Sequence, residues 1–401
     1  MTATMTQRKP RPISKEKVKE MEPEAVKAAY GRLNSKRLEN MDKVPFEKVL
    51  IHGLVRDSQG RKMSKSLGNG IDPLEVIDQY GADALRYFLT TNSSPGLDMR
   101  YDESKVEASG NYLNKIWNSA RYVLDILGKD FKAKELKFNE LPTMEKYIIS
   151  RLNETINNVT KNMDKYELGA ASSHLYNFVY DDFCSFYLEM SKLTNETEAT
   201  KQTLFHVLKS IVLMIYPYTP FITEEIYQNL PGHKESIMLE TYPTYSKKMV
   251  DKKAVEQVSL LNNMIKDIRN YKVSNKIAPN AEVNLNIVTK DKLFDGFTTY
   301  LKRFSFAKKI EITNQAVKGI SFTYPNATLV IDVNIDKNEL MSRLKQELDH
   351  INQEIKRSEG LLNNPNFVKK APKEKLKLEK DKYEKHKLTK KSLLDKINAL
   401  K

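Results

Sequence analysis

The sequence predicts a mainly α-helical protein with two smaller parts that contain β-strands. Three observations predict this fold class. Apolar residues recur every three or four positions through most of 111–250, which is typical of packed helices. Short runs of alternating apolar and polar residues lie within 251–335, and a heptad-like pattern fills 336–401. These two patterns are typical of half-buried strands and of a coiled coil, respectively.

The composition limits the class of protein and its partners. The 401 residues suffice for about two to four domains, and the formal net charge of +14 favours an anionic partner. The single cysteine, Cys184, excludes a disulfide framework and a multi-cysteine zinc site, so no metal site is predicted. No apolar run reaches about eighteen residues, so we expect no membrane span and a cytoplasmic location.

Two regions precede the long helical part of the chain. Residues 1–43 predict a basic, helical arm, and residues 44–110 predict the end of an α/β domain. VPFEKVLIHGLV (44–55) has the apolar, β-branched composition of a buried strand. IDPLEVIDQYGADALRYFLTT (71–91) predicts two short helices, the first with Asp72 as its N-cap and proline at its first position.

Residues 111–250 predict a helical bundle. Four segments carry apolar residues at helical spacing: 111–127, 144–166, 171–193 and 203–230. Pro217 and Pro220 break the last segment, because proline lacks the backbone donor that a helix interior needs. Cys184 lies in one of the apolar stretches and is predicted to be a buried, inert thiol.

The C-terminal third predicts two further parts. Residues 251–335 begin with a helix and then predict a small α+β unit, with strands at 283–288, 308–313 and 327–333. Residues 336–401 predict two helices on either side of a turn bracketed by Pro365 and Pro372, which makes an antiparallel coiled-coil hairpin. From residue 337 onward, 18 lysines and arginines face 10 aspartates and glutamates, a balance of +8. More than half of the net charge therefore lies on this hairpin.

The string GRKMSKSLGN (60–69) is a basic loop suited to phosphate. Lys62 and Lys65 offer ammonium donors, two serines add hydroxyl donors, and the glycines permit the bends. Negative charge accumulates on pyrophosphate as it leaves a nucleoside triphosphate, and mobile ammonium groups stabilise that transition state. By composition alone, such a loop is more often a solvated turn than a catalytic element.

The string Lys62-Met63-Ser64-Lys65-Ser66 resembles the KMSKS signature of class I aminoacyl-tRNA synthetases. Its setting, GRKMSKSLGNGIDPLEVIDQYGADALRYFL, is similar to the valyl, isoleucyl and leucyl enzymes. Three later segments resemble the valyl enzymes: DMRYDESKVEASGNYLNKIWNSARYVL, YNFVYDDFCSFYLEMSK and YPYTPFITEEIYQNLP. The hairpin also resembles that family, whereas isoleucyl enzymes often end in a cysteine-rich module and leucyl enzymes lack the hairpin. The chain thus resembles the C-terminal portion of valyl-tRNA synthetases (valine–tRNA ligases), from the KMSKS loop onward.

This resemblance assigns a role to each predicted part. It implies that 44–110 is a remnant of a Rossmann-type catalytic domain and that 111–250 is an anticodon-binding helical bundle. It also implies that the small α+β unit (251–335) leads into a tRNA-binding hairpin (336–401). The implied partner is tRNA, with valine tRNA preferred.

The resemblance also assigns candidate site residues. The family's nucleotide is ATP with Mg²⁺, and its phosphates would be contacted by Lys62, Met63, Ser64, Lys65 and Ser66. Lys62 and Lys65 would be the catalytic residues of an incomplete site. Lys369 and Lys370, at the tip of the hairpin, are candidate RNA contacts.

The family's second nucleotide motif, His-x-Gly-His, does not occur among the six histidines of this sequence. The valine pocket and the editing domain also have no counterpart in these residues. A KMSKS loop alone cannot orient valine for attack on the α-phosphate. The sequence therefore predicts a truncated synthetase-like protein that mainly binds tRNA, is inactive alone, and has a separate N-terminal synthetase half as an expected partner.

Two other functions stay open on the sequence alone. One is a stand-alone tRNA-binding or regulatory module that has lost the enzyme. The other is a coiled-coil interaction protein in which affinity for RNA is incidental. The KMSKS lysines distinguish the first of these from a synthetase portion, because a module that only binds tRNA does not need them.

Overall fold

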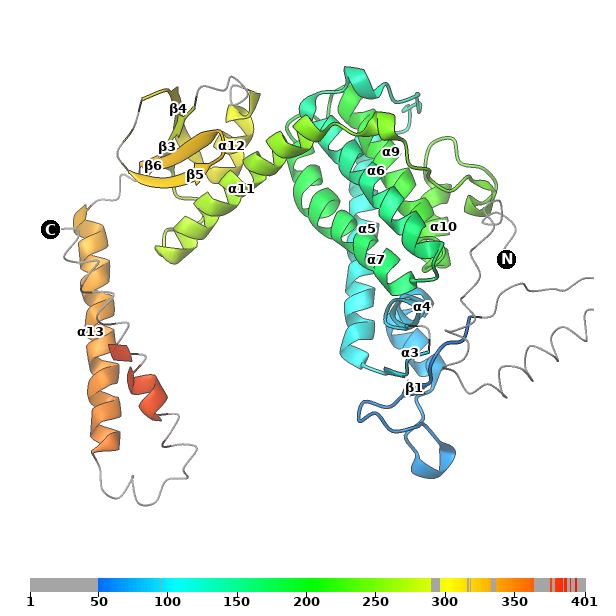
Figure 1. Cartoon of the computed structure of the whole chain (residues 1–401), viewed down its shortest axis with the longest axis horizontal. Helices are drawn as coiled ribbons and strands as arrows, with labels where there is room; N and C mark the ends of the chain where they lie inside the picture. The colour runs from blue at the N-terminus through cyan, green and yellow to red at the C-terminus, as the bar shows by residue number, and fades with distance from the viewer. Residues whose placement is uncertain are drawn as a thin grey trace, which may run out of the picture. The chain divides into compact units, whose positions relative to one another are not determined.

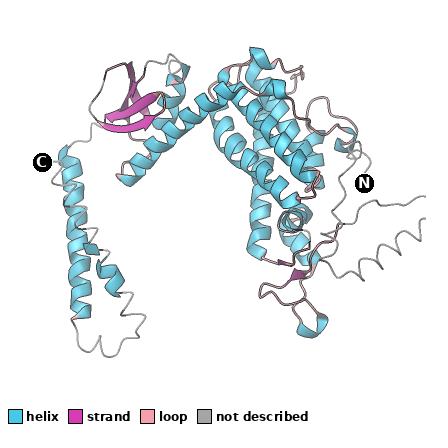
Figure 2. Ribbon diagram, viewed as in Figure 1, coloured by secondary structure: helices cyan, strands magenta, loops and turns pink. Residues whose placement is uncertain are grey.

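The computed structural model describes residues 50–94, 96–289, 296–315, 317, 319–332 and 337–363, together with part of 376–394. The predicted arm (1–43) and the candidate RNA contacts Lys369 and Lys370 lie outside the described residues. The chain divides into two compact units, Met1–Asn263 and Met264–Lys401. As predicted, the fold is mainly helical, with two small sheets (Figures 1 and 2). The domain boundaries given above stay predictions.

A short parallel sheet opens the described part of the first unit. Strand β1 (Val55–Arg56) pairs with β2 (Met99–Arg100). The side chain of Asp98 joins the two, because its oxygens accept hydrogen bonds from the Leu54 amide (2.7 Å) and from Arg56 Nε (2.5 Å). At Gly53, an added Cβ would stand 1.9 Å from the Leu97 carbonyl oxygen, so the close approach of these segments requires glycine.

The prediction of a buried strand over 44–55 is wrong for its described part. The extended strand begins only at Val55, and the Leu50 and Leu54 residues are 43% and 49% exposed. A parallel strand is normally buried when it has neighbours on both sides and helices on both faces. Here β1 has one partner of two residues among the described ones, so the apolar composition is not matched by burial.

Two short helices follow the loop, as predicted. Helix α3 (Pro73–Tyr80) begins after Asp72, whose side chain accepts a hydrogen bond from the Leu74 amide at 2.8 Å. Proline occupies the first helical position, where its missing N–H costs nothing. Gly81, with φ of +88°, separates this helix from α4 (Ala82–Thr91).

The predicted helical bundle is present and makes the core of the first unit (Figure 1). It consists of α5 (Glu103–Leu127), α6 (Thr143–Met163), α7 (Leu168–Asn177), the π-helix η3 (Phe178–Tyr187), α8 (Leu188–Ser191), α9 (Glu198–Ile215) and α10 (Pro220–Gln228). Short 3-10 turns lie between or after these helices: η2 (Phe138–Glu140), η4 (Ile237–Leu239) and η5 (Lys247–Met249). Helix α5 starts eight residues before the predicted segment, because Asp102 caps it by accepting from the Ser104 amide.

The bundle also anchors the two short helices that follow the loop. Asp83 of α4 is buried, and its carboxylate accepts hydrogen bonds from the amides of Phe221 (3.4 Å) and Ile222 (2.7 Å) at the start of α10. The carboxylate therefore caps α10 from a neighbouring helix, in the place where a helix N-terminus favours negative charge. This contact joins the segment after the loop to the last helix of the bundle.

The sequence predicts one regular helix over 171–193, and the structure differs from this prediction. Its central ten residues, Phe178–Tyr187, form a π-helix between α7 and α8. The apolar spacing of this aromatic-rich stretch does not separate 3.6 residues per turn from a wider turn, so the sequence pattern missed it. Cys184 lies within this π-helix and is buried as predicted, with its Sγ 3.1 Å from Ser119 Oγ. Burial raises the pKa of this thiol.

The second unit contains a four-stranded sheet of order β4-β3-β6-β5, which follows helix α11 (Lys252–Ser274). The strands of the sheet are β3 (Val283–Val288), β4 (Ala307–Thr313), β5 (Ile320–Tyr324) and β6 (Ala327–Asp332). Helix α12 (Thr298–Ser305) lies between β3 and β4 in the sequence. Strand β3 pairs in parallel with β4 and antiparallel with β6, which also pairs with β5. The three predicted strands are thus present, whereas β5 and α12 were not predicted.

The C-terminal hairpin is described in part. Helix α13 (Lys337–Leu362) is followed by helical positions between 376 and 394. Ser358 Oγ donates a hydrogen bond to Glu379 (2.8 Å), and the Tyr383 hydroxyl donates one to Glu359 (2.8 Å). These contacts join α13 to the helical positions that follow it. The antiparallel coiled-coil arrangement stays a prediction.

Candidate functional site

The basic loop 60–69 leaves strand β1 through a tight turn. The Asp57 amide donates to the Arg61 carbonyl (3.0 Å), and the Gly60 amide donates to the Asp57 carbonyl (2.9 Å). Gly60 has φ of +82°, a conformation that favours glycine. The turn brings the backbone of Lys62 back beside Arg56, with which it forms an antiparallel bridge.

The rest of the loop is a single 3-10 turn, η1 (Lys65–Leu67). Ser64 caps it, since Ser64 Oγ accepts a hydrogen bond from the Leu67 amide at 3.3 Å. Gly68, with φ of +58°, ends it. None of the three residues of this turn is buried, so apolar packing does not hold the loop in place.

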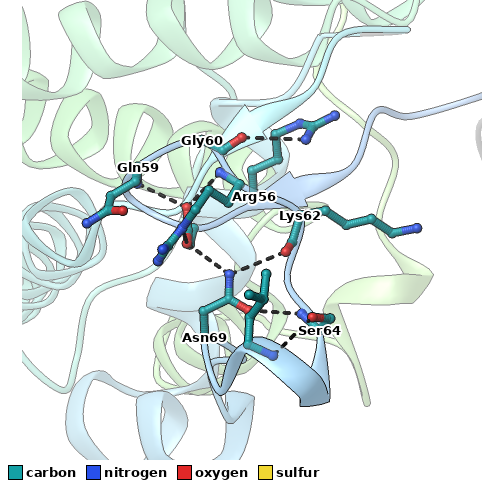
Figure 3. A network of polar contacts seen from close by, with 9 residues as sticks. Arg56, Gln59, Gly60, Lys62, Ser64 and Asn69 are labelled. Carbon is teal, nitrogen blue, oxygen red and sulfur yellow. Dashed lines mark hydrogen bonds and ion pairs between the residues drawn. The ribbon is translucent and has the colours of Figure 1, made fainter.

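Asp57 is the centre of a polar network at the base of the loop (Figure 3). Asp57 is 6% exposed, and its carboxylate accepts four hydrogen bonds. They come from the Gln59 amide (3.1 Å), the Arg61 amide (2.7 Å), Arg61 Nε (2.7 Å) and Asn69 Nδ2 (2.9 Å). The Asn69 hydrogen bond is the largest of the effects that hold the pKa of this carboxyl well below its usual range, so Asp57 is ionised.

Asn69 connects this carboxylate to the first half of the loop. Its Oδ1 accepts a hydrogen bond from the Ser64 amide (2.9 Å), and its Nδ2 also lies 3.3 Å from the Lys62 carbonyl oxygen. One side chain therefore bonds the backbone on both sides of Met63 and the buried carboxylate below it (Figure 3).

The predicted site residues are contiguous, and the structure presents their two ammonium groups to solvent. Lys62 and Lys65 are exposed, and within the described residues neither ammonium group forms a hydrogen bond or an ion pair. Figure 3 shows the Lys62 side chain extending away from the Asp57 network. Met63 and Ser64 are half-buried and Ser66 is exposed. Contact of these residues with ATP stays a prediction.

Two residues that organise the loop, Asp57 and Asn69, were not predicted from the sequence. The signal for Asp57 is the string DSQG, in which an aspartate precedes a glycine by three positions, as in many β-turns. The signal for Asn69 is weaker, because an asparagine between two glycines also suits an ordinary loop.

A second candidate surface lies on the bundle. A cavity of about 460 Å³ opens beside α5 and the segment from η3 to α8. Among its lining residues are Asn114, Lys115, Asn118, Tyr122, Cys184 and Lys192. Lys192 Nζ stands 5.7 Å from the centre of the Tyr122 ring, so a cation and an aromatic face border the same hollow.

A pair of stacked tyrosines lies next to this cavity. The rings of Tyr176 and Tyr180 are 5.4 Å apart and nearly parallel, at 6°, and each residue is 37% exposed. Lys115, which lines the cavity, has its Nζ 3.8 Å from the centre of the Tyr180 ring. Exposed aromatic faces with nearby cations suit stacking with unpaired bases and contact with their phosphates.

The described residues hold no group of three or more histidine, cysteine, aspartate or glutamate side chains that could bind a metal ion. In the same residues, no helix has the length and apolar character to cross a membrane. The geometry presents two candidate surfaces: the basic loop, and a polar cavity on the bundle that is also lined by Glu189, which pairs with Lys192 at 2.7 Å.

Three family profiles match parts of this chain. The profile of class I tRNA synthetases (I, L, M and V) matches residues 31–102, which include the loop. The profile of the anticodon-binding domain of tRNA ligases matches residues 145–288. The profile of the valyl-tRNA synthetase tRNA-binding arm matches residues 336–401.

Whole-sequence comparison finds the same family. The chain is 42% identical over 358 residues to the valine–tRNA ligase of Geobacillus stearothermophilus, covering 85% of this chain and 41% of the relative. It is 41% identical over 383 residues to that of Listeria innocua, covering 89% of this chain and 42% of the relative. The chain thus spans about two fifths of the length of these relatives.

Among solved structures, one similar chain is that of Agrobacterium radiobacter K84 AgnB2 LeuRS in a ternary complex with tRNA and LeuAMS. The TM-score is 0.45 at 21% identity, covering 75% of this chain and 35% of that one. The profiles and the curated relatives are the basis of the assignment. The chain belongs to the valyl-tRNA synthetase family of class I aminoacyl-tRNA synthetases and corresponds to the C-terminal portion of its members.

Proposed function

We propose that this chain binds tRNA, with valine tRNA preferred, and carries the ATP-contacting loop of a valine–tRNA ligase. The observation that carries the proposal is that synthetase, anticodon-binding and tRNA-arm profiles follow one another along one chain. The net charge of +14 supports it, since neutralising phosphates is the main source of affinity for nucleic acid.

The proposed role of the loop is to neutralise the phosphates of ATP. Lys62 and Lys65 extend into solvent from a backbone that is closed at its base, and this arrangement fits a polyphosphate. In the family the nucleotide is ATP with Mg²⁺, and the metal would neutralise phosphate oxygens. The two ammonium groups would act on the leaving pyrophosphate, where negative charge grows in the transition state.

We propose further that the 401 residues by themselves do not form valyl-adenylate. The loop supplies one side of a nucleotide site, and the sequence holds no His-x-Gly-His to supply the other. ATP–pyrophosphate exchange with the purified chain tests this. Exchange that depends on valine would contradict it.

An N-terminal synthetase portion is the proposed protein partner. Five leucines in 50–97 are between 43% and 67% exposed: Leu50, Leu54, Leu67, Leu74 and Leu97. Leu54 and Leu97 lie close in sequence to β1 and β2, whereas Leu67 belongs to η1 and Leu74 to α3. Among the described residues, the sheet has two strands of two residues each, which is too small to be stable without further cover. The remaining part of a class I catalytic domain would bury these side chains.

For the bundle, we propose that the cavity beside α5 receives unpaired bases of the anticodon loop. Tyr122 offers a ring on which a base can stack, and Lys115 lies where it can meet a phosphate. Lys192 would have to leave its ion pair with Glu189 (2.7 Å) to do the same. Stacking on an aromatic side chain contributes about 1–3 kcal/mol per base. This interaction does not require the tyrosine hydroxyl.

Replacing Tyr122 with alanine is therefore expected to weaken tRNA binding by about 5- to 150-fold, which corresponds to the loss of one stacked base. Tyr122→Phe keeps the ring and is expected to bind within about twofold of the wild type. Tyr245→Ala, at an exposed tyrosine outside the cavity, is the matched control. Fluorescence anisotropy with labelled tRNA measures all four proteins. Equal affinities for Tyr122→Ala and the wild type would rule out this cavity.

A further inference from the structure

We infer that Asp57 and Asn69 are positioning residues for Lys62 and Lys65, and that together they form a clasp that closes the KMSKS loop at its base. The inference rests on the proposed action of the two lysines on polyphosphate. The clasp consists of the hydrogen bond from Asn69 Nδ2 to Asp57 Oδ2 (2.9 Å) and of the backbone contacts that each side chain makes.

The clasp holds the loop at several points. Asp57 accepts from the amides of Gln59 and Arg61, which fixes the turn that precedes the lysines. Asn69 accepts from the Ser64 amide and donates to the Lys62 carbonyl, which fixes the segment that carries them. The hydrogen bond between the two side chains joins these halves. Its loss would remove the side-chain link between the turn and the lysine segment, and only backbone contacts such as the bridge from Arg56 to Lys62 would still connect them.

Polar contacts hold the loop in place because apolar packing is absent from the η1 turn. No residue of η1 is buried, and Leu67 is 60% exposed. Each freely rotating backbone residue must be ordered when the lysines meet a ligand, and that ordering opposes binding. A loop that is already closed at its base avoids part of this loss, so its ammonium groups lie closer to the geometry that the reaction needs.

Asp57 and Asn69 have different hydrogen-bonding roles, so a single substitution can break the clasp without changing the size of the side chain. Asp57 is an ionised acceptor, and Asn69 must accept with Oδ1 while it donates with Nδ2. Asn69→Asp keeps the size and the acceptor but replaces the donor with a second carboxylate against Asp57. Like charges at this distance repel and raise the pKa of the pair, whereas the Arg61 guanidinium, with its Nε 2.7 Å from Asp57 Oδ2, opposes this rise. A proton shared by the two carboxyl groups is therefore expected only at acidic pH. A role in packing alone would give no such pH dependence.

The experiment uses the full chain and two readouts. Hydrogen exchange gives protection factors for the amides of Arg61 and Ser64, and titration calorimetry gives the affinity for inorganic tripolyphosphate with Mg²⁺. At pH 8, Asn69→Asp is expected to lower both protection factors by about tenfold or more, the effect of losing about 1.4 kcal/mol of local stability. As the pH falls, the shared proton restores a donor, so the difference from the wild type is expected to shrink towards acidic pH.

Two further variants make the test specific. Asp57→Asn combined with Asn69→Asp restores an amide and a carboxylate with their roles exchanged, and is expected to recover part of the protection that Asn69→Asp loses. Ser58→Asp adds a carboxylate beside the turn at an exposed position and is expected to leave both amides protected. Recovery in the double variant shows that the two side chains act on each other.

The phosphate readout separates the clasp from the proposed function. Tripolyphosphate affinity is expected to fall in Lys65→Ala and, by a similar factor, in Asn69→Asp at pH 8. An affinity that falls in Lys65→Ala but not in Asn69→Asp would overturn the positioning role and leave the proposed function intact. An affinity that is unchanged in Lys65→Ala would overturn the proposed function of the loop, and the positioning role with it. Unchanged protection factors in Asn69→Asp would overturn the clasp itself.

Discussion

Replacing Lys65 with alanine is expected to lower adenylate formation by about 10²- to 10³-fold in an enzyme that contains this chain. The reason is that one preorganised donor at a developing negative charge contributes about this factor to the rate of the chemical step. The assay needs a complete catalytic site. A fusion of the N-terminal part of the Geobacillus stearothermophilus enzyme to this chain would provide one, because the two sequences are 42% identical over the shared part.

The measurement is valine-dependent ATP–pyrophosphate exchange by the fusion and its variants. Lys308→Ala, at an exposed lysine of β4 in the second unit, is the matched control and is expected to keep wild-type exchange. Binding of tRNA by the Lys65→Ala chain is expected to stay within about twofold of the wild type, because one phosphate contact at most is lost. Wild-type exchange in the Lys65→Ala fusion would favour a tRNA-binding module whose loop has no catalytic role.

Binding of tRNA is expected to weaken by about 10³-fold between 50 and 200 mM salt, the loss expected for contacts to about six phosphates. The net charge of +14, with a balance of +8 from residue 337 onward, provides cations for that number of contacts. Measuring affinity over a salt series gives the slope of log affinity against log salt. If the chain uses its coiled coil only to bind another protein, no selective tRNA binding is expected at any salt concentration.

Substitutions of single charged residues on the hairpin test whether it contributes to the phosphate contacts. Lys356 and Lys380 are exposed, and neutralising a lysine that contacts a phosphate reduces the salt slope by about one. Glu384→Gln also removes one charge from an exposed position of the same hairpin, but it is expected to keep or strengthen binding. A shallow slope in the wild type, unaffected by either lysine, would contradict RNA binding by the hairpin.

Much of the fold could be predicted because the sequence carries local signals for it. Asp72 followed by proline marks the start of α3, and glycine marks its end, since these residue types satisfy or terminate helices by their own chemistry. The strand at 283–288 alternates apolar and polar residues, and every second residue is buried. The strand at 327–333 is marked instead by the apolar, largely β-branched run of Leu329, Val330 and Ile331, all of which are buried.

The errors occurred where tertiary surroundings decide the structure. The run 44–55 has the composition of a buried strand, but burial depends on neighbouring elements rather than on the strand itself. The π-helix of Phe178–Tyr187 differs from an α-helix in hydrogen-bond register, which apolar spacing does not report. Strand β5 (ISFTY) does alternate apolar and polar residues, so here the sequence carried a local signal that the prediction did not use.

The candidate site was predicted in part. The string from Lys62 to Ser66 identified the loop, because this order of residues is a signature of class I aminoacyl-tRNA synthetases. The contact between Asp57 and Asn69 joins residues twelve positions apart through side chains, and no local periodicity reveals it. The cavity beside α5 was also not predicted, because it forms only where Tyr122 and the π-helix lie side by side in the fold.

The most direct test of the central claim is a competition titration of the purified chain with valine tRNA and with a tRNA that carries a different anticodon. A selective tRNA-binding portion of a valine–tRNA ligase is expected to bind valine tRNA at least about tenfold more tightly, a difference of about 1.4 kcal/mol. Tight binding of valine tRNA that the second tRNA displaces only at higher concentration is the predicted result. Equal affinity for the two tRNAs, or no measurable binding of either, would contradict the account.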